Sequence, residues 1–102
     1  MSQTIVISAG RNVGNEPMSA QEWELLHINI EETLDASHVI YYTKRAIGAG
    51  DYEGMKEESV TYVVEIHETH LSDIMRGLSK LAGLFKQESI ALMVVDRTIF
   101  CG

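Results

Sequence analysis

The sequence predicts an α+β domain of the ferredoxin-like type, in which a four-stranded antiparallel sheet carries two helices on one face. Four short segments are rich in β-branched and other apolar residues, and two longer segments repeat apolar residues every three or four positions. Their order is βαββαβ, two βαβ halves joined by a hairpin. The chain has 102 residues, 45% of them hydrophobic, which is enough to bury a core. We therefore expect residues 1–102 to form one domain.

The first strand and helix have clear local signals. The β-branched segment 4–9 predicts a strand, and the turn-forming residues of segment 11–17 predict a loop. Ser19 and Glu22 have the spacing of a capping box, in which both side chains satisfy free backbone groups at a helix start. Apolar side chains then follow at helical spacing: Trp23, Leu26, Ile30 and Leu34. This stripe predicts a helix that packs on the sheet.

The rest of the chain adds three strands and one helix. Segment 38–47 alternates and is rich in β-formers, so it predicts the second strand. A glycine-rich and acidic connection over residues 48–58 leads to the third strand, segment 60–67. Apolar residues at helical spacing predict a helix over 71–86. Segment 90–95 predicts the fourth strand.

One face of the predicted sheet has no helix, and its apolar content is high. Alternation turns Val60 and every second residue after it toward the helices and leaves their neighbours outward. The outward apolar side chains are Val6, Val63, Met93 and Val95. Because a bare apolar patch in water is unfavourable, we expect Val63, Met93 and Val95 to lie in an interface between copies of the chain. Two alternatives stay open: a ligand covers the face, or these are scattered exposed apolar residues without a function.

Charge and composition narrow the classes of partner. Eight lysines and arginines against fifteen aspartates and glutamates give a formal net charge of −7, which would repel nucleic-acid phosphates and anionic membrane surfaces. No apolar run is long enough to cross a bilayer, and the residues after Met1 do not resemble a secretory signal. The single cysteine, Cys101, cannot form a disulfide within the chain. These features predict a cytoplasmic protein that binds neither nucleic acid nor membrane.

The loop after the first strand holds the strongest candidate for ligand binding. Arg11 and Asn12 lie between a strand and a helix start, where backbone N–H groups and a guanidinium can hold a carboxylate or phosphate. Of the adjacent Tyr41 and Tyr42, one must face outward and can stack on a planar ligand; Tyr42 is the candidate. Asparagine and glycine also occur in such loops because they form turns. In that case Arg11 pairs with an acidic side chain such as Glu16.

A catalytic alternative rests on histidine and carboxylate chemistry. The imidazole of His67 is the side-chain type most often used as a general base, and Glu65 or Tyr42 would stand beside it in a cavity between two copies. Such a cavity suits a small cofactor-independent enzyme of the isomerase or monooxygenase type. His67, Glu65 and His70 are also of the types that bind zinc, iron or manganese. Since the two histidines do not share one face of a regular helix and no third ligand has a recognisable spacing, we expect no metal and no cofactor.

In size, net charge and predicted fold, the chain resembles small acidic single-domain proteins encoded by bacteriophages. This resemblance rests on no shared motif, and it implies a protein that acts by binding a host component, for example as an inhibitor of a host system. We interpret the chain as a non-enzymatic binding protein that self-associates through its sheet. It would recognise either a host protein or a small anionic, nucleotide-like molecule. A host protein would meet the acidic connection that ends at Glu58, and its binding would weaken with salt.

Overall fold

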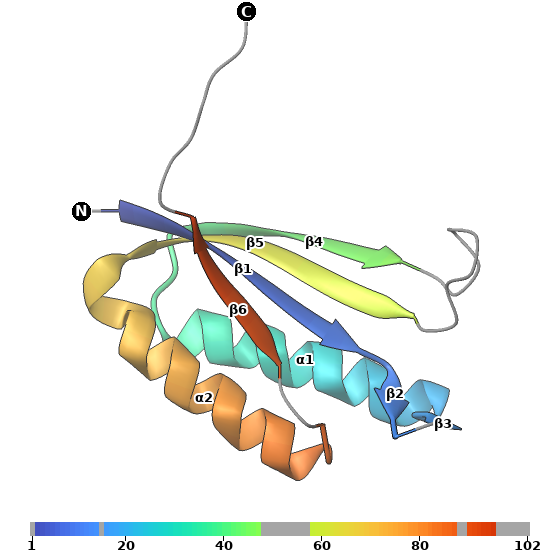
Figure 1. The fold of residues 1–102 in the computed structure, drawn as a ribbon. Helices are drawn as coiled ribbons and strands as arrows, with labels where there is room; N and C mark the ends of the chain where they lie inside the picture. The colour runs from blue at the N-terminus through green and yellow to red at the C-terminus, as the bar shows by residue number, and fades with distance from the viewer. Residues whose placement is uncertain (1, 15, 48–57, 88–89, 96–102) are drawn as a thin grey trace, which may run out of the picture.

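A computed structural model describes residues 2–14, 16–47, 58–87 and 90–95 (Figure 1). Its elements follow in chain order: β1 (Ser2–Gly10), β2 (Asn12–Val13), β3 (Glu16–Pro17), α1 (Ala20–Ala36), β4 (Tyr41–Ile47), β5 (Ser59–His67), the 3-10 turn η1 (Glu68–His70), α2 (Leu71–Leu84) and β6 (Ala91–Val95). Most of the predicted connection between the second and third strands, and Cys101, fall outside the described residues.

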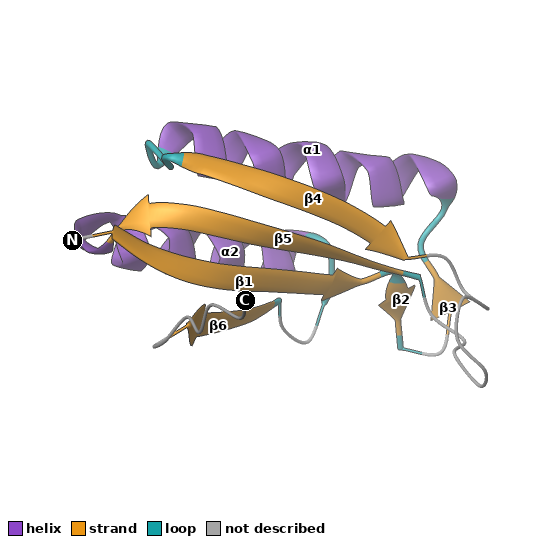
Figure 2. Cartoon of the chain, turned by 90° about the horizontal axis from the view of Figure 1, so that it is seen from above, coloured by secondary structure: helices purple, strands orange, loops and turns teal. Residues whose placement is uncertain are grey.

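The four long strands form one antiparallel sheet in the order β4-β5-β1-β6. Both helices lie against the same face of this sheet, so the molecule has one helical layer and one sheet layer (Figure 1). Figure 2 shows the sheet from above, with α2 behind β5 and β1 and with α1 along the β4 edge. The predicted ferredoxin-like α+β fold is therefore confirmed. In the described part of the chain, no helix is long and apolar enough to span a membrane.

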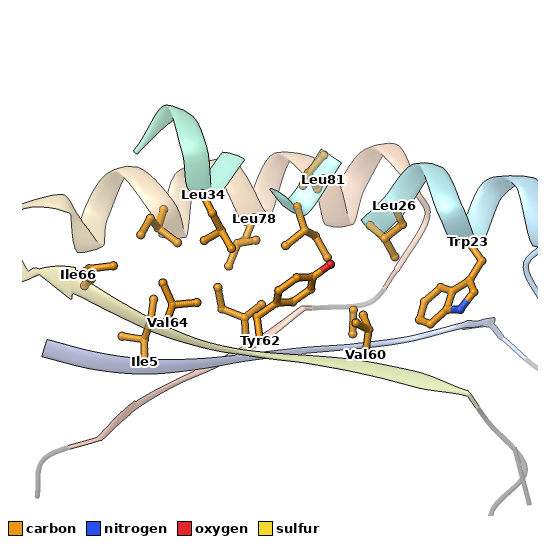
Figure 3. Packing of buried hydrophobic residues seen from close by; sticks show 14 of the residues in the cluster. Ile5, Trp23, Leu26, Leu34, Val60, Tyr62, Val64, Ile66, Leu78 and Leu81 are labelled. Carbon is orange, nitrogen blue, oxygen red and sulfur yellow. The ribbon is translucent and has the colours of Figure 1, made fainter. Parts of the chain in front are cut away.

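The core lies between the sheet and the helices (Figure 3). The rows predicted to face inward from β1 and β5 are buried, as is the stripe of α1: Ile5, Ile7, Ala9, Val60, Tyr62, Val64, Ile66, Trp23, Leu26, Ile30 and Leu34. From α2 the buried residues are Ile74, Leu78, Leu81 and Ala82. On β6 the inward side chains are less covered because this strand is an edge of the sheet, and Val94 is 38% exposed.

The two helices approach each other closely at Gly77. A Cβ atom placed on Gly77 would lie 2.6 Å from Cγ2 of Thr33 on α1. Thr33 is itself fixed, because its Oγ1 donates to the carbonyl of Asn29 at 2.9 Å and β-branched side chains have few rotamers in a helix. The start of α1 is as predicted: Ser19 is its N-cap, and its Oγ accepts from the backbone N–H of Glu22 at 3.1 Å.

Several boundaries differ from the prediction by one to three residues, and two of them have a clear local reason. β4 begins at Tyr41 rather than at residue 38, because His38 has a φ of 54° and cannot continue a strand. α2 ends at Leu84 rather than at residue 86, because Lys86 has a φ of 57°. The segment predicted as a loop over 11–17 contains the small antiparallel pair β2 and β3. These differences leave the topology unchanged.

Candidate functional site

The face of the sheet away from the helices is the main candidate for function, and we call it the open face. The strand register arranges its twelve central residues in three rows that cross β4, β5, β1 and β6 in that order. The rows are Tyr41, Glu65, Thr4, Val95; Thr43, Val63, Val6, Met93; and Arg45, Thr61, Ser8, Ala91. In the middle row, Val63 is 42% and Met93 60% exposed. Among the described residues, no helix or strand covers this face (Figures 1 and 2).

Among these twelve residues of the open face, one is acidic and one is basic. Glu65 stands in the first row, where its Oε2 accepts a hydrogen bond from Oγ1 of Thr4 at 2.6 Å. Arg45 stands in the third row at the edge strand and has no ion-pair partner among the described residues. Ser8 and Thr61 are within hydrogen-bond distance of each other, 3.3 Å between their hydroxyl oxygens. The face is thus electrically neutral in a chain of net charge −7.

The outward tyrosine is Tyr41, not Tyr42. Tyr41 lies opposite Glu65 and is 61% exposed. Tyr42 lies opposite the buried Val64 on the helix side, where its ring meets the ring of Tyr62 at 5.9 Å. Burial there, with a smaller effect from nearby carboxylates, raises the pKa of Tyr42 above its ordinary value. Tyr42 therefore cannot join a ligand site on the open face, and Tyr41 stands in the place predicted for it.

The predicted catalytic group is divided between the two faces. Glu65 and His67 are on the same side of β5, whereas Tyr42 is on the other. Nδ1 of His67 lies 2.8 Å from Oγ1 of Thr69 and accepts from the Thr69 backbone N–H, so this imidazole caps the turn that follows β5. The ring of His70 lies 6.3 Å from that of His67 and 6.0 Å from that of His38. Within the described ranges, no three histidine, cysteine, aspartate or glutamate side chains are grouped so that they could hold a metal ion.

Arg11 ties the loop after β1 to two other segments. Its Nε donates to the carbonyl of Met18 at 2.8 Å, and its Nη1 meets Oε2 of Glu58 at 2.7 Å. The backbone joins the same partners, because Arg11 N–H donates to the Glu58 carbonyl and Met18 N–H donates to the Arg11 carbonyl. The acidic partner is thus Glu58 rather than Glu16. Glu58 also neutralises the charge that the predicted anion would meet.

We expect the Arg11→Ala variant to lose thermal stability. The change removes a side-chain bond to a buried residue's carbonyl and leaves Glu58 without its cation, a combined loss of about 1 to 2 kcal/mol. A melting curve against that of Arg76→Ala, whose ion pair with Asp73 is far more exposed, measures the difference. An unchanged melting temperature combined with a lost ligand would instead support the predicted role of Arg11 and Asn12 in binding.

A hollow of about 310 Å³ lies beside this loop, at the end of α2. Its apolar lining comes from Val13, Pro17, Met18, Leu84 and Phe85, and its polar lining from Glu16, Glu22 and Lys86. The sequence gives no local sign of this hollow, because the left-handed residue Lys86 and the β2–β3 pair that shape it are not visible as a pattern. We call it the hairpin hollow.

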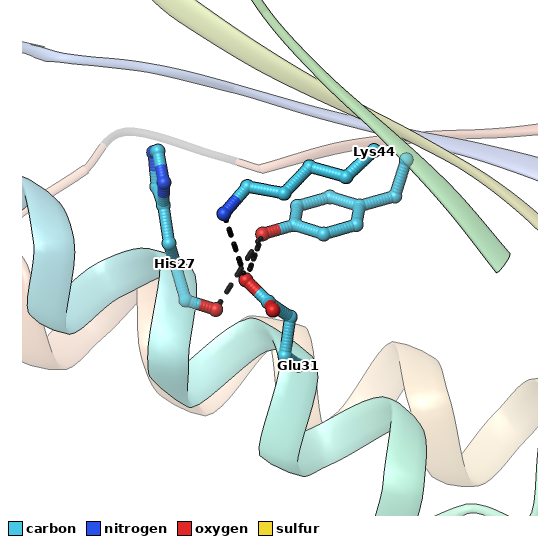
Figure 4. A network of polar contacts seen from close by, with 4 residues as sticks. His27, Glu31 and Lys44 are labelled. Carbon is cyan, nitrogen blue, oxygen red and sulfur yellow. Dashed lines mark hydrogen bonds and ion pairs between the residues drawn. The ribbon is translucent and has the colours of Figure 1, made fainter.

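A polar network joins α1 to the sheet near its β4 edge (Figure 4). Oε2 of Glu31 accepts from Tyr62 Oη at 2.9 Å and from Lys44 Nζ at 3.0 Å. Although burial works to raise the pKa of Glu31, these two donors hold it below its ordinary value. Burial, and then the hydrogen bond to Glu31, raises the pKa of Tyr62. Burial, and then the charge of Lys44, lowers the pKa of His27.

This network serves the fold. It keeps Tyr62 protonated and Glu31 ionised, so the hydroxyl of a buried tyrosine has a charged acceptor. Lys44 also passes over the Tyr62 ring, with its Nζ 5.9 Å from the ring centre. None of these groups faces the open face or lines the hairpin hollow.

Comparison with known proteins adds structural similarity only. No family model matches the sequence, and no curated protein matches it. A phage SAM lyase, solved with S-methyl-5'-thioadenosine, is 14% identical; the match covers 92% of this chain and 80% of the lyase, with a TM-score of 0.59. A PII-like protein of Thiomonas intermedia, solved with ADP, AMP and acetate, is 14% identical over 91% of this chain and 82% of its own, with a TM-score of 0.58.

A third similar structure is the periplasmic divalent cation tolerance protein CutA of Archaeoglobus fulgidus. It is 12% identical, and the match covers 97% of this chain and 88% of that protein, with a TM-score of 0.50. At these identities the matches show a shared ferredoxin-like arrangement and carry no residue across.

Proposed function

We propose that this chain is a small binding protein that self-associates through its open face and holds an adenine-containing small molecule. The observation that carries the proposal is the apolar middle row of the open face. Val63, Val6 and Met93 lie side by side on three neighbouring strands, with only neutral residues and one opposite-charge pair around them. Covering such a row removes apolar surface from water, which is the main favourable contribution to association.

The hairpin hollow is our candidate for the ligand site. Its volume of about 310 Å³ is at the lower end of the range for small-molecule sites, and its lining offers both apolar and charged side chains. Phe85 and Leu84 offer surface to a flat base, and Lys86 offers one positive charge to a phosphate beside the two acidic lining residues, Glu16 and Glu22. Similar folds solved with ADP, AMP or S-methyl-5'-thioadenosine support an adenine-containing ligand. The recognition of a host protein is the other interpretation that the sequence left open.

Calorimetric titration with AMP, ADP and S-methyl-5'-thioadenosine tests the ligand. We expect Lys86→Asn to weaken AMP and ADP about tenfold, a loss of roughly 1.4 kcal/mol, and to leave the uncharged S-methyl-5'-thioadenosine unaffected. Asparagine is chosen because it tolerates the left-handed backbone at this position. Lys80→Asn removes the same charge from an exposed position of α2 outside the hollow and serves as the control.

Two results would count against this ligand proposal. If none of the three compounds binds, the small-molecule interpretation fails and a protein partner becomes the leading candidate. If Lys80→Asn and Lys86→Asn weaken AMP equally, the ligand responds to overall charge and does not occupy the hairpin hollow.

Catalysis on an adenosyl compound is the second candidate. Glu65, held by Thr4, and His67 lie on the same side of β5, so a second copy over the open face would enclose a carboxylate and an imidazole together. The similarity to a phage SAM lyase suggests the substrate to test. Incubation with S-adenosylmethionine, followed by chromatography for S-methyl-5'-thioadenosine, decides the matter: product formation that His67→Gln abolishes would support an enzyme. Unchanged substrate would leave binding as the function.

A further inference from the structure

We propose that Arg45 of one copy forms an ion pair with Glu65 of the partner subunit across the open face. This inference rests on the proposed self-association and names the polar contact that orients it. The two residues are the only charged ones in the three rows, and they stand in opposite outer rows with the apolar row between them. Such a placement is complementary to a second copy of the same surface.

Within one copy the two charges are too far apart to pair. Arg45 is four positions along β4 from Tyr41, which lies opposite Glu65. At about 3.3 Å per residue, the two rows are roughly 13 Å apart. Covering the face without bringing the charges together would leave both ions buried and uncompensated, which is strongly unfavourable. A partner that packs stably on the open face must therefore place an anionic group near Arg45 and a cationic group near Glu65.

A second copy with its rows reversed meets both needs at once. The third row then lies over the partner's first row, and the two middle rows lie over each other. Packed sheets are about 10 Å apart, a gap that an extended arginine can bridge. Thr4 already holds Oε2 of Glu65, and a carboxylate can accept further hydrogen bonds on its other oxygen. Tyr41 lies in the row that receives Arg45 and offers its ring face to the guanidinium.

The overall charge favours the same surface for contact between copies. With a net charge of −7, two copies repel each other through most of their surface. The three rows are neutral, so apolar burial on this face is not opposed by like charges. In the arrangement with unreversed rows the strand order is reversed instead, so Arg45 would lie over Ala91 and Glu65 over Thr4 of the second copy, and neither charge would meet its opposite.

Charge reversal in mixed variants tests the pair. We expect Arg45→Glu and Glu65→Arg each to lower the sedimentation coefficient to that of a monomer, since each variant faces itself with like charges. Mixing equal amounts of the two should restore the assembled species, with both chains present by native mass spectrometry. Arg76→Glu, an equal charge change on the exposed side of α2, should leave assembly unchanged. Circular dichroism checks that each variant is folded. If Glu65→Arg does not fold, the separate neutral variants Arg45→Gln and Glu65→Gln take the place of the charge reversals, and each should weaken assembly.

The outcomes separate this inference from the proposed function. A wild-type monomer at micromolar concentration would contradict both. A wild-type assembly that both reversals leave intact, or variants that do not reassemble on mixing, would overturn the Arg45–Glu65 contact. Self-association through the open face would then be judged by substitution of Met93 in the middle row.

Discussion

We expect the Gly77→Ala variant to unfold at a temperature about 5 to 10 °C below that of the wild type. The new methyl group would lie 2.6 Å from Thr33 Cγ2, and Thr33 cannot rotate away without losing its bond to Asn29. At 2.6 Å the overpacking cost falls in the upper part of its usual range of about 1 to 3 kcal/mol, so about 1 to 2 kcal/mol remains after subtracting the roughly 1 kcal/mol that alanine gains over glycine in helix propensity. In a domain of this size each kcal/mol corresponds to several degrees. Thermal melting followed by circular dichroism gives the value.

Two further variants make the steric explanation specific. Thr33→Ser removes Cγ2 and keeps the hydroxyl bonded to Asn29, so it should restore the stability of Gly77→Ala. Gly83→Ala places its methyl group where no atom lies within 4 Å, so it should leave the melting temperature unchanged or raise it. If the variants at Gly77 and Gly83 behaved alike, helix propensity and not the contact between α1 and α2 would govern stability.

The largest effect on assembly is expected from Met93→Glu, which should yield a folded monomer. Met93 stands in the middle row of the open face and is 60% exposed in the isolated chain. A glutamate there would be solvated in the monomer and buried in an assembly, which should weaken association by about 3 kcal/mol or more. Sedimentation velocity measures the change in mass, and circular dichroism checks the fold.

Met75→Glu provides the matched comparison. Met75 is 50% exposed on α2, on the other side of the molecule from the open face (Figure 1). The same chemical change at this position should leave the assembled mass unaltered. An assembly lost in Met75→Glu and retained in Met93→Glu would place the contact between copies on the helices.

Strong local patterns explain why the fold could be predicted from sequence. Val60, Tyr62, Val64 and Ile66 alternate without exception, so one face of β5 had to be buried. The alternation over segment 38–47 that predicted β4 does not separate apolar from polar residues in the same way, because polar residues occur on both sides of this strand. Lys44 even points toward the helix layer, where it reaches Glu31 from the edge of the sheet. The orientation of Tyr41 and Tyr42 therefore depended on the register with β5, which a single strand does not reveal.

The candidate sites depended on contacts between distant parts of the chain. Arg11 could be recognised as an unusual cation in an acidic protein, but its partner Glu58 follows 47 residues later. Each of these residues has a side chain that suits several partners, and only the arrangement of β1 beside β5 brings the two together. The neutral charge pattern of the open face likewise follows from the register of four strands, so it has no signature in any one of them.

The strand order has a consequence for how the chain acquires its structure. β1 lies between β5 and β6, and its residue Thr4 is paired with Glu65 and Val95. Closing such long loops carries an entropic cost before any pairing compensates it, so folding should be slow for a chain of this length. During synthesis on the ribosome, β1 would remain unpaired until β5 had emerged. Its apolar residues would be available to chaperones during that interval.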